Sequence, residues 1–451
     1  MTSVLPAPAK AIPIVPGRLP VLGHLMDFRK DTLGLLRRAR AYGPVVQLFL
    51  GPMRAYVVND AALARQILVG ESRNFDKGRF WEKVSAVVGN GLANASGEHH
   101  LRQRRLMQPA FHRNRIAGYA DTMAAHMQAQ AESWQENTVL SIPDVMRDMA
   151  LSIVSKTLFA SGLGDAAATA IRTHFPAVQD GVMRRTMLPL GPLENLPTPG
   201  NRRFNEGMAS IWSTAGEVVA QYRADGVDHG DLLSMLIAAV DEETGEQMTD
   251  EQIRDEVLTL ALAGSDTTAN AMAWLCYQLG QRPEVADRIA EEVRTVVGDR
   301  PVTFADLSKL DYTCRVVQEI FRMYTFWVLM RRALTDVNLD GYVLPKGSQV
   351  LLSLLSIHRD ADAYRNPMSL DPDRWLPERV KDIPRTAIMP FGAGNRQCIA
   401  DRFATTEVTI AAATIVPRWE LRPIPGHVTT EVVRISVNPS SLPMRLVRRT
   451  K

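Results

Sequence analysis

The chain has 451 residues, of which 46% are hydrophobic and 22% charged, and its formal net charge at pH 7 is +3. This balance is typical of a globular protein and excludes a disordered or fibrous chain. The 52 lysines and arginines nearly match the 49 aspartates and glutamates, so the composition gives no support for a nucleic-acid partner.

The cysteine count and the first residues bear on the compartment. Cys276, Cys314 and Cys398 are too few for a disulfide framework and favour a reducing cytoplasm. Five prolines between Pro6 and Pro20 are incompatible with a spanning helix, so we expect no signal peptide and no membrane anchor. We expect a Pro-rich N-terminal segment over 1–24 and a single domain over 25–451.

The patterning along the chain predicts mostly helices. A helix is expected over 33–42, then a β-hairpin formed by 45–50 and 55–58. Helical periodicity dominates from about 60 to 320, with breaks near 76–97, 186–201 and 224–231. Short strands are predicted around 337–343 and 348–352, loops over 358–397, a helix from near Cys398 to Ile415, and a last hairpin from 432–437 and 444–447. The predicted fold class is mainly α with a minor β region (α+β).

The segment 390–400, PFGAGNRQCIA, carries the strongest chemical signal. Cys398 follows a Gly-rich turn and precedes a predicted apolar helix, whose N-terminal N–H groups would stabilise a thiolate. Gly392 and Gly394 let the backbone approach a flat ligand, and Arg396 can pair with an anionic group on its edge. A lone cysteine at a helix start is more often structural, but four fixed residues at set spacing favour a ligand.

This segment resembles the haem-binding signature of the cytochrome P-450 family, Phe-x-x-Gly-x-Arg-x-Cys-x-Gly. Phe391, Gly394, Arg396 and Cys398 match it, whereas Ala400 stands where the family usually has glycine. The resemblance implies a helical prism enclosing haem b, with Cys398 as the ligand to the iron. Phe391, Arg396 and Ala400 would then also contact the cofactor, with Phe391 shielding the sulfur.

A second motif, Ala263-Gly264-Ser265-Asp266-Thr267-Thr268, lies in a helix predicted over about 251–279. Its small residues would let a macrocycle and dioxygen come close, and Asp266 with Thr267 forms an acid–alcohol pair suited to proton relay. A polar notch in a core helix is the alternative. By resemblance, Asp266 and Thr267 deliver protons during oxygen activation, and Ala263 and Gly264 adjoin the haem.

Glu319 and Arg322 lie three residues apart on one predicted helix face, where an ordinary surface ion pair is the simple interpretation. The resemblance instead implies a buried pair that is joined by Arg374 and supports the haem loop.

Further arginines are candidates for the haem propionates. His100 and Arg104, one helical turn apart, and Arg331 match propionate-binding positions of the family. The alternatives for the cluster 102–105 are a solvated basic face or a dock for an acidic electron-transfer protein.

The substrate is expected to be apolar. Candidate pocket residues are Phe80, Trp81, Val88, Met187, Leu262, Trp327 and Val328. The segments 75–78, 188–193, 201–204 and 327–333 are similar to those of bacterial members of soluble type that oxidise cyclic sesquiterpenes.

The resemblance thus implies a monooxygenase that inserts one oxygen atom from O2 into a cyclic terpene in secondary metabolism. Hydroxylation of a macrolide, polyketide or fatty acid is one alternative, and a non-hydroxylating haem protein (a sensor, isomerase or coupling enzyme) is another. No nicotinamide or flavin motif is evident, so electrons from NAD(P)H are expected through a separate ferredoxin or flavodoxin with its reductase.

Overall fold

The computed structural model describes residues 9–159, 163–187, 196–324 and 326–449. The chain divides into two compact units, each assembled from discontinuous segments. The first, here called the sheet unit, comprises 1–82, 322–369 and 377–398, and the second, the helical unit, comprises 83–321, 370–376 and 399–451. The boundaries near 82 and 321 fall within helices α4 (Arg79–Val88) and α14 (Asp311–Met323). That residues 25–451 form a single domain stays a prediction.

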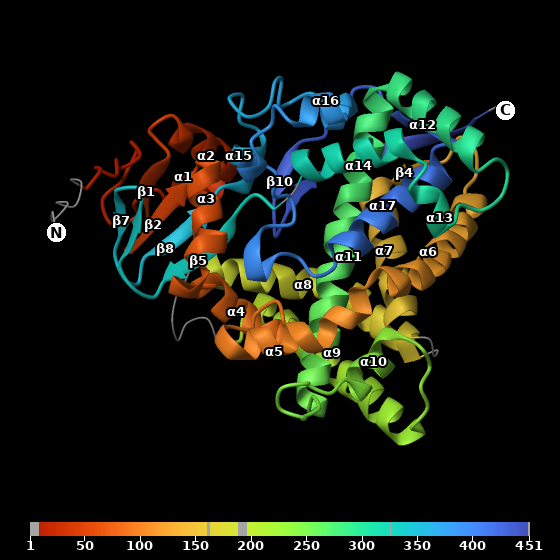
Figure 1. Cartoon of the computed structure of the whole chain (residues 1–451), viewed down its shortest axis with the longest axis horizontal. Helices are drawn as coiled ribbons and strands as arrows, with labels where there is room; N and C mark the ends of the chain where they lie inside the picture. The colour runs from red at the N-terminus through yellow and green to blue at the C-terminus, as the bar shows by residue number, and fades with distance from the viewer. Residues whose placement is uncertain (1–8, 160–162, 188–195, 325, 450–451) are drawn as a thin grey trace, which may run out of the picture. The chain divides into compact units, whose positions relative to one another are not determined.

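The sheet unit is built on a five-stranded sheet in the order β1-β2-β8-β5-β3 (Figure 1). Strand β2 runs parallel to β8, whereas the other neighbouring pairs are antiparallel. The parallel pairing brings Ala55–Val58 beside Gln349–Leu352, and the apolar side chains of both segments are buried. The strands are β1 (Val45–Leu50), β2 (Met53–Val58), β3 (Phe75–Asp76), β5 (Leu329–Ala333) and β8 (Gln349–Leu352).

Short helices and one hairpin complete this unit. Strands β6 (Val337–Leu339) and β7 (Tyr342–Leu344) are joined at Asp340-Gly341, where both residues have positive φ, as the turn between two paired strands requires. The helices and helical turns are α1 (Leu25–Lys30), α2 (Thr32–Arg40), α3 (Ala61–Arg65), η1 (Gln66–Gly70), η2 (Ser72–Asn74), α15 (Leu354–His358), α16 (Pro377–Val380), η6 (Arg385–Ala387) and η7 (Gly394–Arg396).

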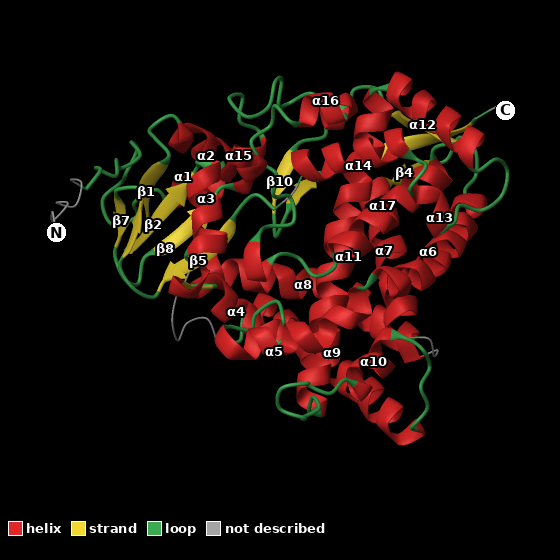
Figure 2. Ribbon diagram, in the orientation of Figure 1, coloured by secondary structure: helices red, strands yellow, loops and turns green. Residues whose placement is uncertain are grey.

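The helical unit is organised around α11 (Asp250–Gln281), which packs against α7, α9 and α17 (Figure 2). A capping box between Thr249 and Gln252 begins this helix, and apolar residues on most of its faces explain why it is buried. Its other helices are α5 (Gly97–Met107), η3 (Gln108–Phe111), α6 (Arg113–Ser133), α7 (Ile142–Leu158), α8 (Leu163–Met187), α9 (Pro199–Asp225), α10 (Leu232–Ala238), α12 (Pro283–Val296), α13 (Phe304–Leu307), η5 (Pro372–Trp375) and α17 (Asp401–Ile415).

Two small sheets belong to the helical unit. One has the order β4-β12-β9 and the other pairs β10 with β11, all antiparallel. Their strands are β4 (Val139–Ser141), β9 (Trp419–Pro423), β10 (Glu431–Val433), β11 (Val437–Pro439) and β12 (Pro443–Arg448).

The predicted fold class, mainly α with a minor β region, is confirmed. The helix near 33–42, the hairpin of β1 and β2, and the break at 224–231 are also found, and Gly226 closes α9 with φ +62°. Within the described residues, each helix is too short or too polar to cross a bilayer.

Two sequence predictions are wrong. The break predicted over 76–97 contains α4, because Phe80, Val84 and Val87 recur with helical spacing between the glycines that flank them. The predicted last hairpin does not form: β10 pairs with β11, whereas β12 pairs with β4 and β9. Asn438-Pro439, expected in a turn, ends strand β11 of a two-stranded sheet, where proline is tolerated.

Candidate active site

Cys398 ends a tight loop of the sheet unit. Its N–H donates to the Phe391 carbonyl at 3.0 Å, and the Gly392 N–H donates to the Met389 carbonyl at 3.0 Å. Gly394 has φ +75°, and a Cβ there would overlap the Leu68 carbonyl oxygen, so this position requires glycine. The Cys398 side chain is exposed, which is unusual for cysteine, one of the residue types most often buried.

The helix predicted from near Cys398 to Ile415 is found as α17 (Asp401–Ile415), which begins two residues later than Ile399. The 3₁₀ turn η7 ends at Arg396, and α17 begins only at Asp401, with Ala400 at the N-cap. Cys398 therefore precedes the first turn of α17.

Arg331 and Arg396, both in the sheet unit, lie close enough for their positive charges to interact. Strand β5 alternates its side chains, so Arg331 is buried on one face while Arg332 on the other pairs with Asp76 at 2.5 Å and with Glu82 at 2.7 Å. Burial, and then the charge of Arg396, lowers the pKa of Arg331 to about 10. Burial also lowers the pKa of Arg396. Such a pair favours an anionic group between or beside the two guanidinium ions.

In the helical unit, the motif 263–268 lies in the middle of α11. Ala263 is exposed although most of its neighbours along the helix are buried. The hydroxyl of Thr267 donates to the Ala263 carbonyl at 2.7 Å, and that of Thr268 donates to the Gly264 carbonyl at 2.8 Å. A Cβ at Gly264 would lie 2.9 Å from Val154 of α7, so glycine here lets the two helices pack closely. The helix is continuous through this motif, and each hydroxyl gives its carbonyl a second donor.

Asp266 is a buried acid beside Thr267. Burial raises the pKa of its carboxyl group, against the opposing charges of Arg147 and Arg434 and the nearby amide of Gln179. Its Oδ2 atom has no hydrogen-bond partner among the described residues. An acid whose protonated form is favoured, with one oxygen unused, is suited to accept and release a proton.

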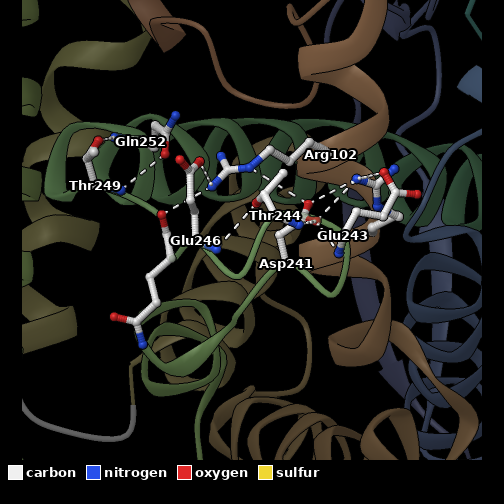
Figure 3. A network of polar contacts seen from close by, with 9 residues as sticks. Arg102, Asp241, Glu243, Thr244, Glu246, Thr249 and Gln252 are labelled. Carbon is white, nitrogen blue, oxygen red and sulfur yellow. Dashed lines mark hydrogen bonds and ion pairs between the residues drawn. The ribbon is translucent and has the colours of Figure 1, made fainter.

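A propionate-binding role for the predicted residues of α5, His100 and Arg104, stays a prediction. His100 is buried and Arg104 half-buried. Their neighbours Arg102 and Arg105 take part in an ion-pair network with the turn before α11 (Figure 3). Arg102 pairs with Glu246 at 3.5 Å, and Arg105 pairs with the buried Asp241 at 3.1 Å.

The buried acid of this network is held ionised. Although burial opposes it, the N–H groups of Glu243 and Thr244 and the Arg105 guanidinium hold the pKa of Asp241 below its usual range. Arg102 and Arg105 are thus neutralised within the unit. A docking role of this face toward an acidic electron-transfer protein stays a prediction.

All three residues of the predicted structural trio are buried. Glu319 accepts hydrogen bonds from Arg374 Nε at 3.2 Å and from Trp375 Nε1 at 3.0 Å, and all three side chains are buried in the helical unit. Arg322 belongs to the sheet unit, where it donates to the His358 carbonyl at 2.6 Å. The interpretation of Glu319 and Arg322 as an ordinary surface pair is wrong, because both are almost completely buried.

Comparison with known proteins identifies the family. The family model for cytochrome P-450 matches residues 13–441. The chain belongs to the cytochrome P-450 family. It is 40% identical to cyclooctat-9-en-7-ol 5-monooxygenase of Streptomyces melanosporofaciens, over 91% of this chain and 90% of that protein. It is 36% identical to pentalenene oxygenase of Streptomyces avermitilis, over 96% and 97%.

A solved structure of the family agrees with the fold. The crystal structure of the cytochrome P-450DA heme domain superposes with a TM-score of 0.89 at 26% sequence identity, over 98% of this chain and 99% of that one. The protein is therefore a P-450 monooxygenase, and its family implies a haem iron.

The predicted pocket residues of this P-450 are all apolar, but they belong to different environments. In the sheet unit, Phe80 and Trp81 are half-buried and stack edge-to-face at 5.7 Å, while Trp327 packs against Phe28 in the core at 5.9 Å. Val328, Val88 and Leu262 are buried. The side chain of Met187, and residues 188–193, lie outside the described residues. A role in the pocket stays a prediction for each.

Sequence reasoning missed two buried acids of this P-450. Glu407 in α17 and Glu256 in α11 are fully buried, and burial raises the pKa of each to about 8. For Glu407, the Thr268 hydroxyl beside it opposes that shift weakly. The signal for Glu407 was an acid in the apolar run from Phe403 to Ile415, where a buried charge would be costly.

Proposed function

We propose that Cys398 is the thiolate ligand of a haem b in this P-450, and that the enzyme inserts one oxygen atom from O2 into a cyclic terpene. The assignment of Cys398 as the ligand is supported by its exposed thiol, which ends a loop in which Gly392 and Gly394 both have positive φ. When bound, haem iron supplies the binding and activation of dioxygen, and a thiolate ligand favours O–O cleavage.

The residues of the sheet unit fit this cofactor. Arg331 is buried, and its described hydrogen bond from Nη1 goes to the neighbouring Met330 carbonyl at 2.8 Å, so the guanidinium retains donors for a propionate. Arg396 carries a second positive charge nearby. Phe391 and Ala400 flank the ligand in the chain, and Phe391 would limit the access of water to the sulfur.

The residues of the helical unit fit proton delivery. We assign Asp266 the role of holding and releasing a proton at its carboxyl group, and Thr267 the role of passing it on through its hydroxyl. The small side chain of Ala263 is exposed on α11 and would let a flat cofactor and dioxygen come close. Gly264, which packs against Val154 of α7, is assigned beside the haem by the family resemblance. His100 and Arg104 of α5 are assigned to a propionate, and Glu319, Arg322 and Arg374 support the fold rather than the chemistry.

The proposed substrate class rests on the relatives and on the apolar pocket candidates. Cyclooctat-9-en-7-ol 5-monooxygenase, cyclooctatin synthase and pentalenene oxygenase are terpene-oxidising proteins at 36–40% identity over most of this chain. Phe80, Trp81, Val88, Leu262, Trp327 and Val328 offer few hydrogen-bonding groups, which suits a hydrocarbon.

We further propose that electrons come from NAD(P)H through a separate ferredoxin or flavodoxin and its reductase, and that the enzyme works in the cytoplasm. Within the described residues no disulfide joins any of the three cysteines, which fits a reducing compartment. Turnover with purified ferredoxin and reductase, compared with flavodoxin and reductase, identifies the electron donor.

The absorption spectrum of the reduced protein with carbon monoxide tests the ligand. A strongly red-shifted Soret band is expected for the native chain and for Cys314→Ser. The Cys314 thiol is half-buried in α14 and donates to the Leu307 carbonyl at 3.4 Å. Cys398→Ser should lose that band and all monooxygenation, and a coupled, active Cys398→Ser variant overturns the assignment. Titration with a cyclic sesquiterpene should then convert low-spin to high-spin haem. A full set of terpenes that leaves the spectrum unchanged contradicts the substrate class but not the ligand.

A further inference from the structure

The segment 87–95 comprises the last two residues of α4, Val87 and Val88, and most of the connection to α5, and is called here the loop Val87–Ala95. Side chains of the helical unit bind successive backbone groups of this loop. The Trp212 indole of α9 donates to the Val87 carbonyl at 2.8 Å. In α11, Asp255 accepts the Asn90 N–H at 2.8 Å, and Glu256 accepts the Leu92 N–H at 2.9 Å. Two helices that are distant in sequence, α9 and α11, therefore fix one short loop. The ring of His99, in the adjacent α5, also lies 3.0 Å from the Asn90 carbonyl.

Two glycines let this loop lie directly on α11. Gly89 has φ +60°, and a Cβ there would overlap the Asp255 carboxylate. A Cβ at Gly91 would overlap the Thr259 hydroxyl and lie 2.7 Å from the Asp255 carbonyl oxygen. The backbone is thus in direct contact with two consecutive turns of the helix that carries the proposed proton-delivery residues.

The contact encloses polar groups that are buried and incompletely satisfied. Glu256 and Gln103 have no exposed surface, and Thr259 is almost completely buried. Glu256 Oε1, both amide atoms of Gln103, and Thr259 Oγ1 lack a hydrogen-bond partner of good geometry among the described residues. Such a cluster contributes little to stability, because buried polar groups cost free energy unless they are paired. A role beyond packing is a better account of its presence.

Charged groups face Glu256 from its own helix and from α5. On α11, the preceding residue Asp255 places a second carboxylate near Glu256, and this carboxylate pairs with Arg254 at 3.1 Å. Across the contact, α5 contributes Gln103 and, one turn earlier, His99 and His100. The range from pH 7 to 9.5 spans the pKa of about 8 to which burial raises the Glu256 carboxyl group.

We propose that Asp255 and Glu256 latch the loop Val87–Ala95 onto α11, and that Glu256 is a positioning residue for substrate binding. The proposal rests on the proposed function, since it takes Val88 in this loop as part of the substrate wall. A neutral Glu256 accepts from Leu92 and keeps a proton to share with Gln103. Because burial raises the pKa of Glu256 to about 8, the acid is neutral at pH 7. Ionisation at higher pH adds a second buried negative charge beside Asp255 and favours an open loop that admits water.

Two variants and one matched control test the latch. Glu256→Gln keeps a neutral acceptor for the Leu92 N–H, whereas Glu256→Ala removes it. Glu407→Gln removes another fully buried acid whose pKa is also about 8 but which lies in α17, away from the loop in sequence. Hydrogen exchange of the peptide 87–95, corrected for the intrinsic pH dependence, reports the loop without any substrate.

We expect the native loop to lose protection as the pH rises from 7 to 9.5, and Glu407→Gln to behave like the native chain. In Glu256→Gln the loop should stay protected from hydrogen exchange over the whole pH range. In Glu256→Ala the loop should exchange rapidly at every pH. Equal protection in all four proteins overturns the latch.

Substrate binding is measured on the same proteins by the spin-state shift with a cyclic sesquiterpene. We expect the dissociation constant to rise about tenfold in Glu256→Ala at pH 7, consistent with the loss of one buried hydrogen bond, with kcat little changed. The dissociation constant of Glu256→Gln at pH 7 should equal the native value. In the native chain this constant should rise above pH 8, and in Glu256→Gln it should not. An exposed loop with unchanged affinity overturns the positioning role. A native chain that binds no terpene instead contradicts the proposed substrate, while the exchange data still decide the latch.

Discussion

Glu319 accepts a hydrogen bond from Arg374 Nε at 3.2 Å, and both side chains are almost completely buried. The same carboxylate accepts the Trp375 indole N–H and the Asp371 backbone N–H, so removing it leaves three donors without an acceptor. Glu319→Ala should therefore lower the free energy of unfolding by about 3–5 kcal/mol, the range for breaking one side of a buried pair. Urea unfolding followed by tryptophan fluorescence measures this loss. Glu291→Ala, which breaks the exposed pair with Arg294, is the control and should cost less than about 1 kcal/mol.

Thr267 is predicted to couple reductant use to product formation. Thr267→Ala should reduce product per NAD(P)H consumed by about tenfold or more and release peroxide instead, because the hydroxyl that passes the proton is gone. Thr267→Ser should retain most of the coupling. Thr157→Ala provides the control, since this buried threonine of α7 also donates to the carbonyl four residues earlier. Unchanged coupling in Thr267→Ala would show that the hydroxyl has no part in proton delivery.

Arg331 is predicted to retain the haem. Arg331→Gln should weaken haem binding by about tenfold or more, because a buried propionate would lose its cation. The rate of haem transfer to excess apomyoglobin measures retention. The matched control is Arg332→Gln on the opposite face of β5, which breaks the pairs with Asp76 and Glu82 but should transfer haem at the native rate. Equal transfer rates in the two variants would remove Arg331 from the binding site.

Glu407 should make the free energy of unfolding depend on pH. Its carboxyl group titrates near pH 8 in the folded chain, against 4.5 as the ordinary value, so the folded state holds a proton that the unfolded state releases. The contribution of protonated Glu407 to the free energy of unfolding is fully present below pH 4.5 and is lost as the pH rises to 8. Glu407→Gln removes this dependence, and its advantage over the native chain should grow by about 3 kcal/mol between pH 4.5 and 7. Urea unfolding of both proteins at pH 4.5 and pH 7 measures this. If the difference in free energy of unfolding between them is the same at both pH values, Glu407 is exposed to solvent and not buried.

The chemistry-bearing segments were largely predictable because their residues lie close together in sequence. The spacing from Phe391 to Cys398 and the run from Ala263 to Thr268 indicated a ligand loop and a polar site in a core helix. The helix start at Asp401 was not predictable in the same way, because it depends on the 3₁₀ turn that ends at Arg396.

Long-range pairing accounts for what the sequence did not reveal. Trp375 lies 56 residues after its partner Glu319. Asp241, the acid that pairs with Arg105, lies 136 residues after it. Local periodicity carries no information at such separations. The same limit explains the last hairpin, since β12 pairs with β4, about three hundred residues earlier in the chain.

The parallel pairing of β2 with β8 sets the order in which the chain can mature on the ribosome. Ala55 emerges early, but its partner Gln349 follows almost three hundred residues later, after all the helices from α3 to α14 have been made. The edge of β2 that β8 will cover must therefore stay unpaired through most of translation, and an unpaired edge is a template for aggregation. Slower production at lower temperature, or a chaperone that shields this strand, should raise the yield of folded enzyme.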